Sequence, residues 1–305
     1  MGLALAVISL AVFVPHLATQ AQLPTEKIIL DTDIGDDIDD AYALAMLAKQ
    51  PNVRLLGVVT AFGETGKRAQ IAAKLLHIAG RDDVPVYAGR PGDHKIGRQY
   101  DWASMYTSSQ IQSGSAVDFM RDQILQSPGE VTLVAIGPLV NLGDLLTRYP
   151  ELESKIKRIV IMGGAVYVGY NNQPPAGPEW NIKCDPLAAR AVFGSGVPIV
   201  MAGLEVTTMM QLDDERQRHV YAYGTPCTDA LAALTALWGG KVPTLFDPVA
   251  AAYACGHVFA DTSQVHVQVQ DDGLTKAVDG APNVTVLVHP RKDEFLDWYV
   301  SALKP

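Results

Sequence analysis

The sequence predicts an α/β protein with an open, mostly parallel, doubly wound (Rossmann-like) sheet, formed as a single domain with extra C-terminal helices. Strand-like and helix-like runs alternate along most of the chain, which is typical of right-handed βαβ units. The strand-like runs are continuously apolar, which indicates strands buried on both faces. No linker rich in Pro, Gly or Ser divides the 305 residues, so the sequence favours one domain over 22–305.

The predicted elements follow one another in a regular order. The strands are short apolar runs at 27–30, 53–60, 84–88, 130–137, 156–164 and 197–203. The helices fill the segments between them, at 39–50, 67–80, 115–126, 138–150 and 185–196. The C-terminal third adds helices at 227–238, at 247–257 and from about 291, with strand-like runs at 264–270 and 283–289. The irregular stretches 90–115 and 165–180 are long enough to be functional loops.

The composition excludes some classes of partner. Hydrophobic residues make up 48% of the chain and charged residues 19%, which allows a large core. The net charge of −9 argues against nucleic acid or an anionic membrane as the main partner, because both require a basic face. The three cysteines form neither a disulfide framework nor a zinc-ligand pattern. A small neutral ligand or a bound cation fits the charge better.

The first 21 residues differ from the rest of the chain. An apolar run from Leu3 to Val14 leads into small and polar residues that end at Ala21, without an acidic residue. This run has the length of a signal-peptide core and is short for a membrane-spanning helix. We therefore expect a signal peptide over 1–21, a secreted or periplasmic protein, and no stable membrane span in the mature chain. A mis-assigned start codon and a buried N-terminal helix are the alternatives.

Acidic residues and glycines follow the predicted strands at their carboxyl ends, where ligands bind in an open parallel sheet. After the first strand come six aspartates within ten residues: Asp31, Asp33, Asp36, Asp37, Asp39 and Asp40. Taken alone, this stretch also suits a solvated turn at the start of a helix. Several carboxylates in one pocket repel one another, which favours a divalent cation among them. Calcium suits an oxygen-rich site, and the sequence has no Cys or His cluster for zinc.

The stretch DTDIGDDIDDA resembles the N-terminal signature of the inosine–uridine-preferring nucleoside hydrolases, which usually reads DTDPGxDDA. The resemblance continues in order through PGEVTLVAIGPLVNLGDLLTRYPEL, IKRIVIMGGAV, EWNIKCDPLAARAVFGSGVPIVMAGLEVT and FDPVAAAYA. It covers nearly all of the chain after the leader. It implies a calcium-dependent nucleoside N-ribohydrolase, an enzyme that converts a small-molecule nucleoside to free base and ribose. A homo-oligomer is a further option that the resemblance implies.

The resemblance also implies a metal site. In the family, Ca²⁺ lies at the bottom of the pocket, and the 2′- and 3′-hydroxyls of ribose complete its coordination. Carried over to this sequence, Asp33 would bind calcium and take a proton from the attacking water. Asp40 and Asp247 would be further ligands, and Val140 would supply a backbone carbonyl. Asp39 would contact the ribose and the surroundings of the metal.

Further positions match the family's substrate-binding residues. Glu179 and Asn181 of the EWN motif match a ribose-binding Glu and Asn, and either Asn171 or Asn172 matches another ribose-binding Asn. Glu64 stands where the family usually has Asn, so an acid replaces an amide near the ribose or the base.

The signature departs from the family's pattern by two extra residues, Asp36 and Asp37. Alignment on the DDA end assigns Asp39 and Asp40 to the site, whereas alignment on the glycine assigns Asp36 and Asp37. We prefer the first, because Asp40 immediately precedes the apolar helix run. Asp31 would then support the site from behind, and the two extra residues would have no assigned chemistry.

The leaving-group side departs as well. Phe246 stands where many members have a His that helps the base to leave, and phenylalanine can stack on a base but cannot protonate it. His94 is the one candidate for a histidine pair expected near 94–101, in a context that does not match. Tyr221, Tyr223 and Trp238 lie in the region that covers the base in relatives.

We therefore expect hydrolysis of the N-glycosidic bond of ribonucleosides by a calcium-positioned water, through an oxocarbenium-like ribosyl cation. One alternative is a hydrolase of the same fold with a non-standard ribosyl substrate, which Glu64 and Phe246 suggest. The other is a calcium-dependent protein that binds nucleosides or sugars without turnover.

Overall fold

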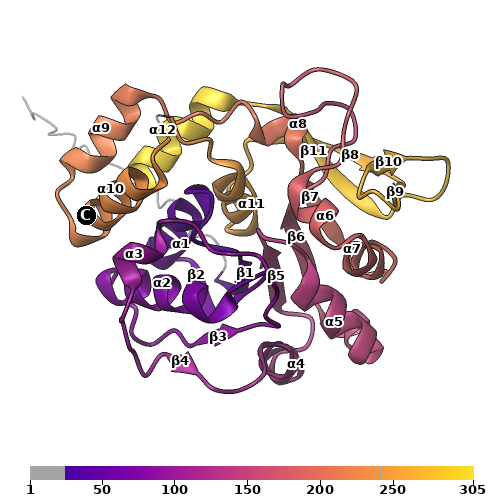
Figure 1. The fold of residues 1–305 in the computed structure, drawn as a ribbon. Helices are drawn as coiled ribbons and strands as arrows, with labels where there is room; N and C mark the ends of the chain where they lie inside the picture. Colours follow the sequence, from indigo (N-terminus) through magenta and orange to yellow (C-terminus); the bar gives the residue numbers. More distant parts are fainter. Residues whose placement is uncertain (1–24, 241) are drawn as a thin grey trace, which may run out of the picture.

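The computed structural model describes residues 25–240 and 242–305, and Figure 1 shows its fold. The strands of the central sheet are β1 (Glu26–Thr32), β2 (Val53–Thr60), β3 (Val86–Ala88), β4 (Ile111–Gln112), β5 (Val131–Ala135), β6 (Arg158–Met162), β7 (Ile199–Ala202), β8 (Ala260–Val265) and β11 (Val284–Pro290). They form a nine-stranded sheet in the order β4-β3-β2-β1-β5-β6-β7-β11-β8. Neighbouring strands are parallel except for β11 and β8, which are antiparallel. The predicted open, mostly parallel sheet is confirmed.

Helices cover both faces of this sheet, as a doubly wound topology requires (Figure 1). One face carries α1 (Asp39–Lys49), α2 (Thr65–Ile78), α10 (Pro226–Trp238), α11 (Phe246–Ala254) and α12 (Lys292–Ala302). The other carries α4 (Ala116–Gln126), α5 (Val140–Arg148), the 3-10 helix η1 (Pro150–Lys155) and α7 (Pro186–Phe193). The remaining helices are α3 (Tyr100–Ala103), α6 (Trp180–Cys184), α8 (Leu204–Thr207) and α9 (Asp214–Ala222).

The central strands are buried on both sides, as their continuous apolar runs predict. Leu30 of β1 and Val134 of β5 belong to the core on one face, and the adjacent Ile29 and Leu133 belong to the core on the other. Successive side chains of a strand point to opposite faces of the sheet. Because both faces are covered here, an alternating polar pattern would bury polar side chains without water or a hydrogen-bond partner.

The strand order places a ligand site at one point of the sheet. The chain adds strands outward from β1 to β4 and then returns to place β5 on the other side of β1. The order therefore reverses between β1 and β5, and in open α/β sheets ligands bind beyond the carboxyl ends of the strands at such a reversal.

One predicted strand divides into two. The run 264–270 is split at His266 into β8 and β9 (Val267–Val269), and β9 pairs with β10 (Thr275–Ala277) in a separate antiparallel hairpin. The Asn283 side chain accepts from the backbone N–H of Val267 over 2.8 Å and donates to its carbonyl over 3.0 Å. This side chain thus provides hydrogen-bond partners for the backbone N–H and carbonyl of Val267, where the chain leaves the main sheet.

The signal peptide predicted at 1–21 lies outside the described residues. Among the residues that the structure describes, no helix is long and apolar enough to cross a bilayer.

Candidate active site

The segment between β1 and α1 brings three carboxylates to the carboxyl edge of the sheet. Asp33 directly follows β1, and Asp39 and Asp40 open α1. Thr32, the last residue of β1, donates its hydroxyl to Asp40 Oδ1 over 2.5 Å and accepts from the backbone N–H of Ile34 over 3.1 Å. The end of the strand thereby fixes the direction of the Asp40 carboxylate.

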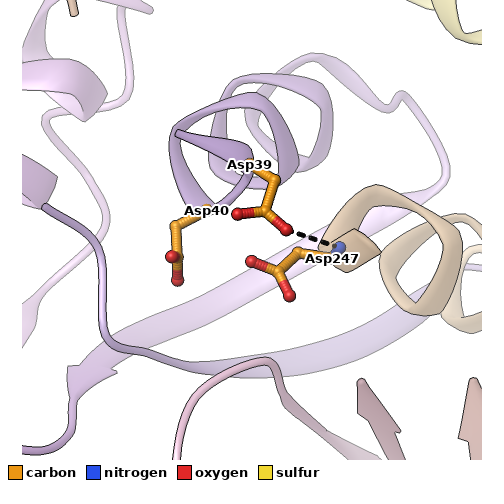
Figure 2. A group of neighbouring side chains, drawn as sticks. All are labelled: Asp39, Asp40 and Asp247. Atoms are coloured by element: carbon orange, nitrogen blue, oxygen red, sulfur yellow. Dashed lines mark hydrogen bonds between the residues drawn. The ribbon is translucent and has the colours of Figure 1, made fainter. Parts of the chain in front are cut away.

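Asp39 and Asp40 meet a third carboxylate from far along the chain. Asp247 lies in the first turn of α11, and a carboxylate oxygen from each of the three lies within 4.8 Å of the others. Figure 2 shows these side chains converging, with the backbone N–H of Asp247 donating to Asp39 Oδ2 over 3.2 Å. All three residues are at most 3% exposed. Both helices start here, and the positive end of a helix dipole stabilises negative charge.

The protein alone does not supply enough positive charge to balance these carboxylates. Burial, followed by the like charges of neighbouring carboxylates, raises the pKa of Asp39, Asp40 and Asp247 well above 3.8. Burial also raises the pKa of Asp33 to about 7, against the opposing effect of the Arg68 guanidinium. A divalent cation would favour the ionised carboxylates, and a donor set made only of oxygen suits a hard cation. The residues present therefore fit a metal.

Asp33 is held closely from two sides. A Cβ atom at Gly137, two residues beyond β5, would lie 2.7 Å from Asp33 Oδ1 and 2.8 Å from Asp33 N. Glycine is therefore required for the ends of the two strands to approach this closely. On the other side, the fully buried Arg68 donates to the backbone carbonyls of Asp33 and Ile34.

Asp31 supports the cluster from within the sheet. Its Oδ1 accepts from Asn141 Nδ2 over 2.8 Å, and Asn141 also donates to the carbonyl of Thr60 over 3.1 Å. Burial raises the pKa of Asp31 to about 8. These contacts join β1, β2 and α5 directly behind the site, in keeping with the supporting role predicted for this aspartate.

A second polar group lies at the ends of β5 and β6. Glu179 caps α6, with its carboxylate accepting from the backbone N–H groups of Gly164 over 2.9 Å and Asn181 over 3.0 Å. Asn181 in turn donates from Nδ2 to the carbonyls of Ile136 and Met162, each over 3.1 Å. The EWN motif is therefore a rigid unit that is tied to two neighbouring strands.

These groups line a cavity of about 460 Å³. Its wall also contains four rings, from Tyr170, Trp180, Phe246 and His94. The rings of Tyr170 and Phe246 meet edge to face at 6.5 Å, and those of His94 and Trp180 lie 6.1 Å apart. The cavity lining thus combines carboxylates with aromatic rings, a combination that suits a ligand with a hydroxyl-rich part and a flat ring.

Most of the predicted site residues meet here. The cavity is lined by the predicted residues Asp33, Asp39, Asp40, Asp247, Glu179, Asn181 and Phe246. Val140 opens α5 at the same edge of the sheet, where a backbone carbonyl was expected from it.

Glu64 and the alternatives Asn171 and Asn172, which were predicted to contact substrate, lie outside this lining. Glu64 Oε1 instead pairs with Lys67 Nζ at 2.9 Å. Asn171 accepts from the backbone N–H of Gln173 over 3.1 Å within its own turn. Asn172 occupies the same turn with a left-handed φ of 56°.

The two candidate aspartate pairs differ in what they face. Asp39 and Asp40 face Asp247, whereas the Asp36 carboxylate binds Arg68 and His94. Asp37 Oδ1 accepts from the backbone N–H of its neighbour Ile38 over 2.7 Å. This geometry favours the alignment on the DDA end of the signature.

Sequence reasoning missed several residues of the lining. Tyr170 and Trp180 are not among the predicted residues, although each is an aromatic residue directly beside a predicted sugar-binding Asn or Glu. Asp36 had no assigned chemistry, and nothing local to it predicts a contact with His94, 58 positions away.

Comparison with known proteins identifies the family of this chain. The sequence model of the inosine-uridine preferring nucleoside hydrolase family matches residues 28–297. The chain is 35% identical to the pyrimidine-specific ribonucleoside hydrolase RihA of Shewanella sp. strain ANA-3, covering 92% of this chain and 96% of the relative. It superposes on a plant nucleoside hydrolase, PpNRh1, with a TM-score of 0.82 at 26% identity, covering 92% and 99% of the two chains. A purine-preferring ribonucleoside hydrolase from Gardnerella vaginalis gives a TM-score of 0.77 at 26% identity, covering 91% of this chain and 98% of that one.

The fold and the site define a metal-dependent hydrolase of the doubly wound α/β class, with its acidic pocket at the reversal of strand order. The chain belongs to the inosine-uridine preferring nucleoside hydrolase family. It is accordingly an enzyme that hydrolyses the N-glycosidic bond of ribonucleosides.

Proposed function

We propose that the metal is Ca²⁺, held by Asp33, Asp40 and Asp247 together with the backbone carbonyl of Val140. The observation that carries this proposal is the convergence of buried carboxylates in the cavity lining, where burial and then like charges raise their pKa values. When bound, calcium would lower the pKa of a coordinated water and bind sugar hydroxyls. Asp39 would lie beside the metal on the side of the sugar.

Asp33 acts as the general base in this proposal. Its side chain lines the cavity, and its backbone is fixed between Gly137 and Arg68. A pKa of about 7 in the protein without metal shows that burial opposes its charge. A nearby cation favours the ionised form, which is the form that can accept a proton from the attacking water.

Glu179 and Asn181 orient the sugar. Both are nearly fully buried, yet line the cavity, and both are locked by hydrogen bonds to backbone groups. Such fixed polar groups hold ribose hydroxyls without losing side-chain freedom on binding. The surrounding carboxylates favour the positive charge that develops on the ribosyl ring in the transition state.

The aromatic wall binds the base. Phe246 and Trp180 offer ring faces, and neither can protonate a leaving base. Tyr170 keeps its proton, because burial raises the pKa of its hydroxyl well above the usual value. We propose pyrimidine ribonucleosides as the preferred substrates, a preference supported by the name of the 35% identical Shewanella relative.

A nucleoside panel tests this function. The full chain with added Ca²⁺ is incubated with uridine, cytidine, inosine and adenosine, and released ribose is measured as reducing sugar. We expect the largest kcat/KM with a pyrimidine, and loss of activity with a chelator that added Ca²⁺ reverses. Purine preference would overturn the base assignment alone, and full activity after exhaustive chelation would overturn the metal.

We also propose that the protein is exported, with removal of residues 1–21. The apolar run from Leu3 to Val14 and the small residues up to Ala21 support this. N-terminal sequencing of the protein from a native host tests it, and recovery of an intact N-terminus from the cytoplasm would contradict it.

A further inference from the structure

The extra residue Asp36 ties a distant loop to the rim of the cavity. Its Oδ2 accepts from Arg68 Nη2 over 2.7 Å and from His94 Nε2 over 2.9 Å. Its Oδ1 accepts from the backbone N–H of Gly97 over 2.8 Å. A carboxylate can only accept, so the imidazole nitrogen that faces it carries the hydrogen. One side chain thus fixes both the ring and the backbone of the 94–99 segment.

The backbone of the two extra residues holds the far end of the same segment. Gln99 is fully buried and donates from Nε2 to the carbonyl of Asp36 over 3.1 Å and to that of Asp37 over 2.7 Å. In the middle of the segment, Glu64 accepts from the backbone N–H of Ile96 over 3.2 Å. The 94–99 segment is therefore attached at its start, middle and end.

The Asp36 side chain is itself held in place by Arg68. Arg68 is fully buried, and besides Asp36 it donates to the carbonyl of Phe62 over 2.8 Å and to that of Asp33. The ring of Phe62 lies 4.9 Å from the ring of His94. Arg68 therefore contacts both the backbone of Asp33, the proposed general base, and the carboxylate that holds His94.

We propose that Asp36 is a positioning residue for substrate recognition, holding His94 and the 94–99 segment as a preformed wall against which the base of the nucleoside packs. His94 lines the cavity beside Trp180, and the two rings make a corner with centroids 6.1 Å apart. A wall that is ordered before binding spares the substrate the cost of ordering it. This inference rests on the proposed binding of the base along the aromatic wall.

The test compares variants of the full, Ca²⁺-loaded chain by steady-state kinetics with uridine and by amide hydrogen exchange. Asp36→Asn removes the charge that holds His94, and we expect about a tenfold rise in KM with kcat within about twofold of wild type. We also expect faster exchange confined to the 94–99 segment. Asp93→Asn is the matched control, because Asp93 is an exposed aspartate adjacent to His94, and it should change neither quantity.

His94→Ala leaves the Asp36–Arg68 pair intact and keeps the test decisive if Asp36→Asn folds poorly. It should raise KM to a similar extent, and the effects of the two substitutions should combine to less than their product, because Asp36 acts in part through His94 and in part through the Gly97 backbone. Multiplying effects, or an unchanged KM in His94→Ala, would overturn the proposal. If wild type releases no ribose from any nucleoside, the proposed substrate fails, whereas unchanged exchange in Asp36→Asn specifically refutes the tether.

Discussion

The backbone N–H of Asp247 donates to the carboxylate of Asp39 over 3.2 Å, although the two residues are 208 positions apart in the sequence. This contact joins the start of α11 to the start of α1 (Figure 2). It brings the third carboxylate to the pair at Asp39 and Asp40, and it makes the site depend on the complete fold rather than on the acidic signature alone.

The two aspartate pairs predict a ranking of variants. Asp40→Asn removes a carboxylate that faces Asp247. We therefore expect kcat/KM with uridine to fall at least 100-fold, roughly the loss seen when one group that stabilises the transition state electrostatically is removed. Asp37→Asn changes a side chain that caps the neighbouring backbone, and the fall should stay below about fivefold. The same substitution at both positions controls for the loss of charge. The reverse ranking would show that the other aspartate pair serves the metal.

Asp33→Asn should nearly abolish turnover. An amide is almost isosteric with the carboxylate but cannot accept the proton of the attacking water, so kcat should fall by about 10³-fold or more. Binding of a nucleoside should persist, as measured by calorimetry at a fixed Ca²⁺ concentration. A variant that retains a tenth of the wild-type kcat would refute the assignment of Asp33 as the base.

Stability without metal should fall as the pH rises. The pKa values of Asp31 and Asp33 are about 8 and about 7 in the folded protein, and those of Asp39, Asp40 and Asp247 are also raised above 3.8. Between pH 4 and 8 the folded chain therefore binds more protons than the unfolded chain, and its stability decreases with increasing pH.

Thermal unfolding of the chelated protein measures this effect. We expect the Tm at pH 8 to lie on the order of 5–10 °C below that at pH 5. Added Ca²⁺ should raise the Tm at pH 8 much more than at pH 5, because cation binding favours the ionised carboxylates. A Tm of the chelated protein that rises from pH 5 to pH 8 would contradict the raised pKa values of these buried carboxylates.

Gly137→Ala should impair catalysis by displacing Asp33. The new methyl group would lie 2.7 Å from Asp33 Oδ1, a contact that cannot form without movement of the strand ends. We expect at least a tenfold loss of kcat/KM in a protein that remains folded by circular dichroism. Gly66→Ala is the control, since nothing lies within 4 Å of a Cβ in that exposed position of α2, and it should keep full activity.

The sequence predicted the parts of the structure that depend on local pattern. Apolar runs such as β5 identified the buried strands, and the parallel order implied that residues after β1 and β5 would meet at one edge. Asp33 could be placed at this edge because it directly follows β1, whereas Asn181 could be placed in the site only through the resemblance of the EWN motif to the family.

What the sequence could not predict depends on side-chain direction. Glu64 follows β2 at the correct edge, but ion pairs with Lys67 and Lys95 turn its carboxylate away from the cavity. The contact of Asp36 with His94 joins two irregular segments whose paths no hydrophobic period describes. Such contacts arise only when the loops fold over one another.

A crystal structure with bound Ca²⁺ tests the central claim most directly. The ion can be located by its anomalous scattering, and its ligands lie within about 2.6 Å of it. The account predicts that carboxylate oxygens of Asp33, Asp40 and Asp247 and the carbonyl oxygen of Val140 are ligands. Coordination by Asp36 or Asp37, or a calcium ion bound away from the Asp39–Asp40–Asp247 cluster, would contradict it.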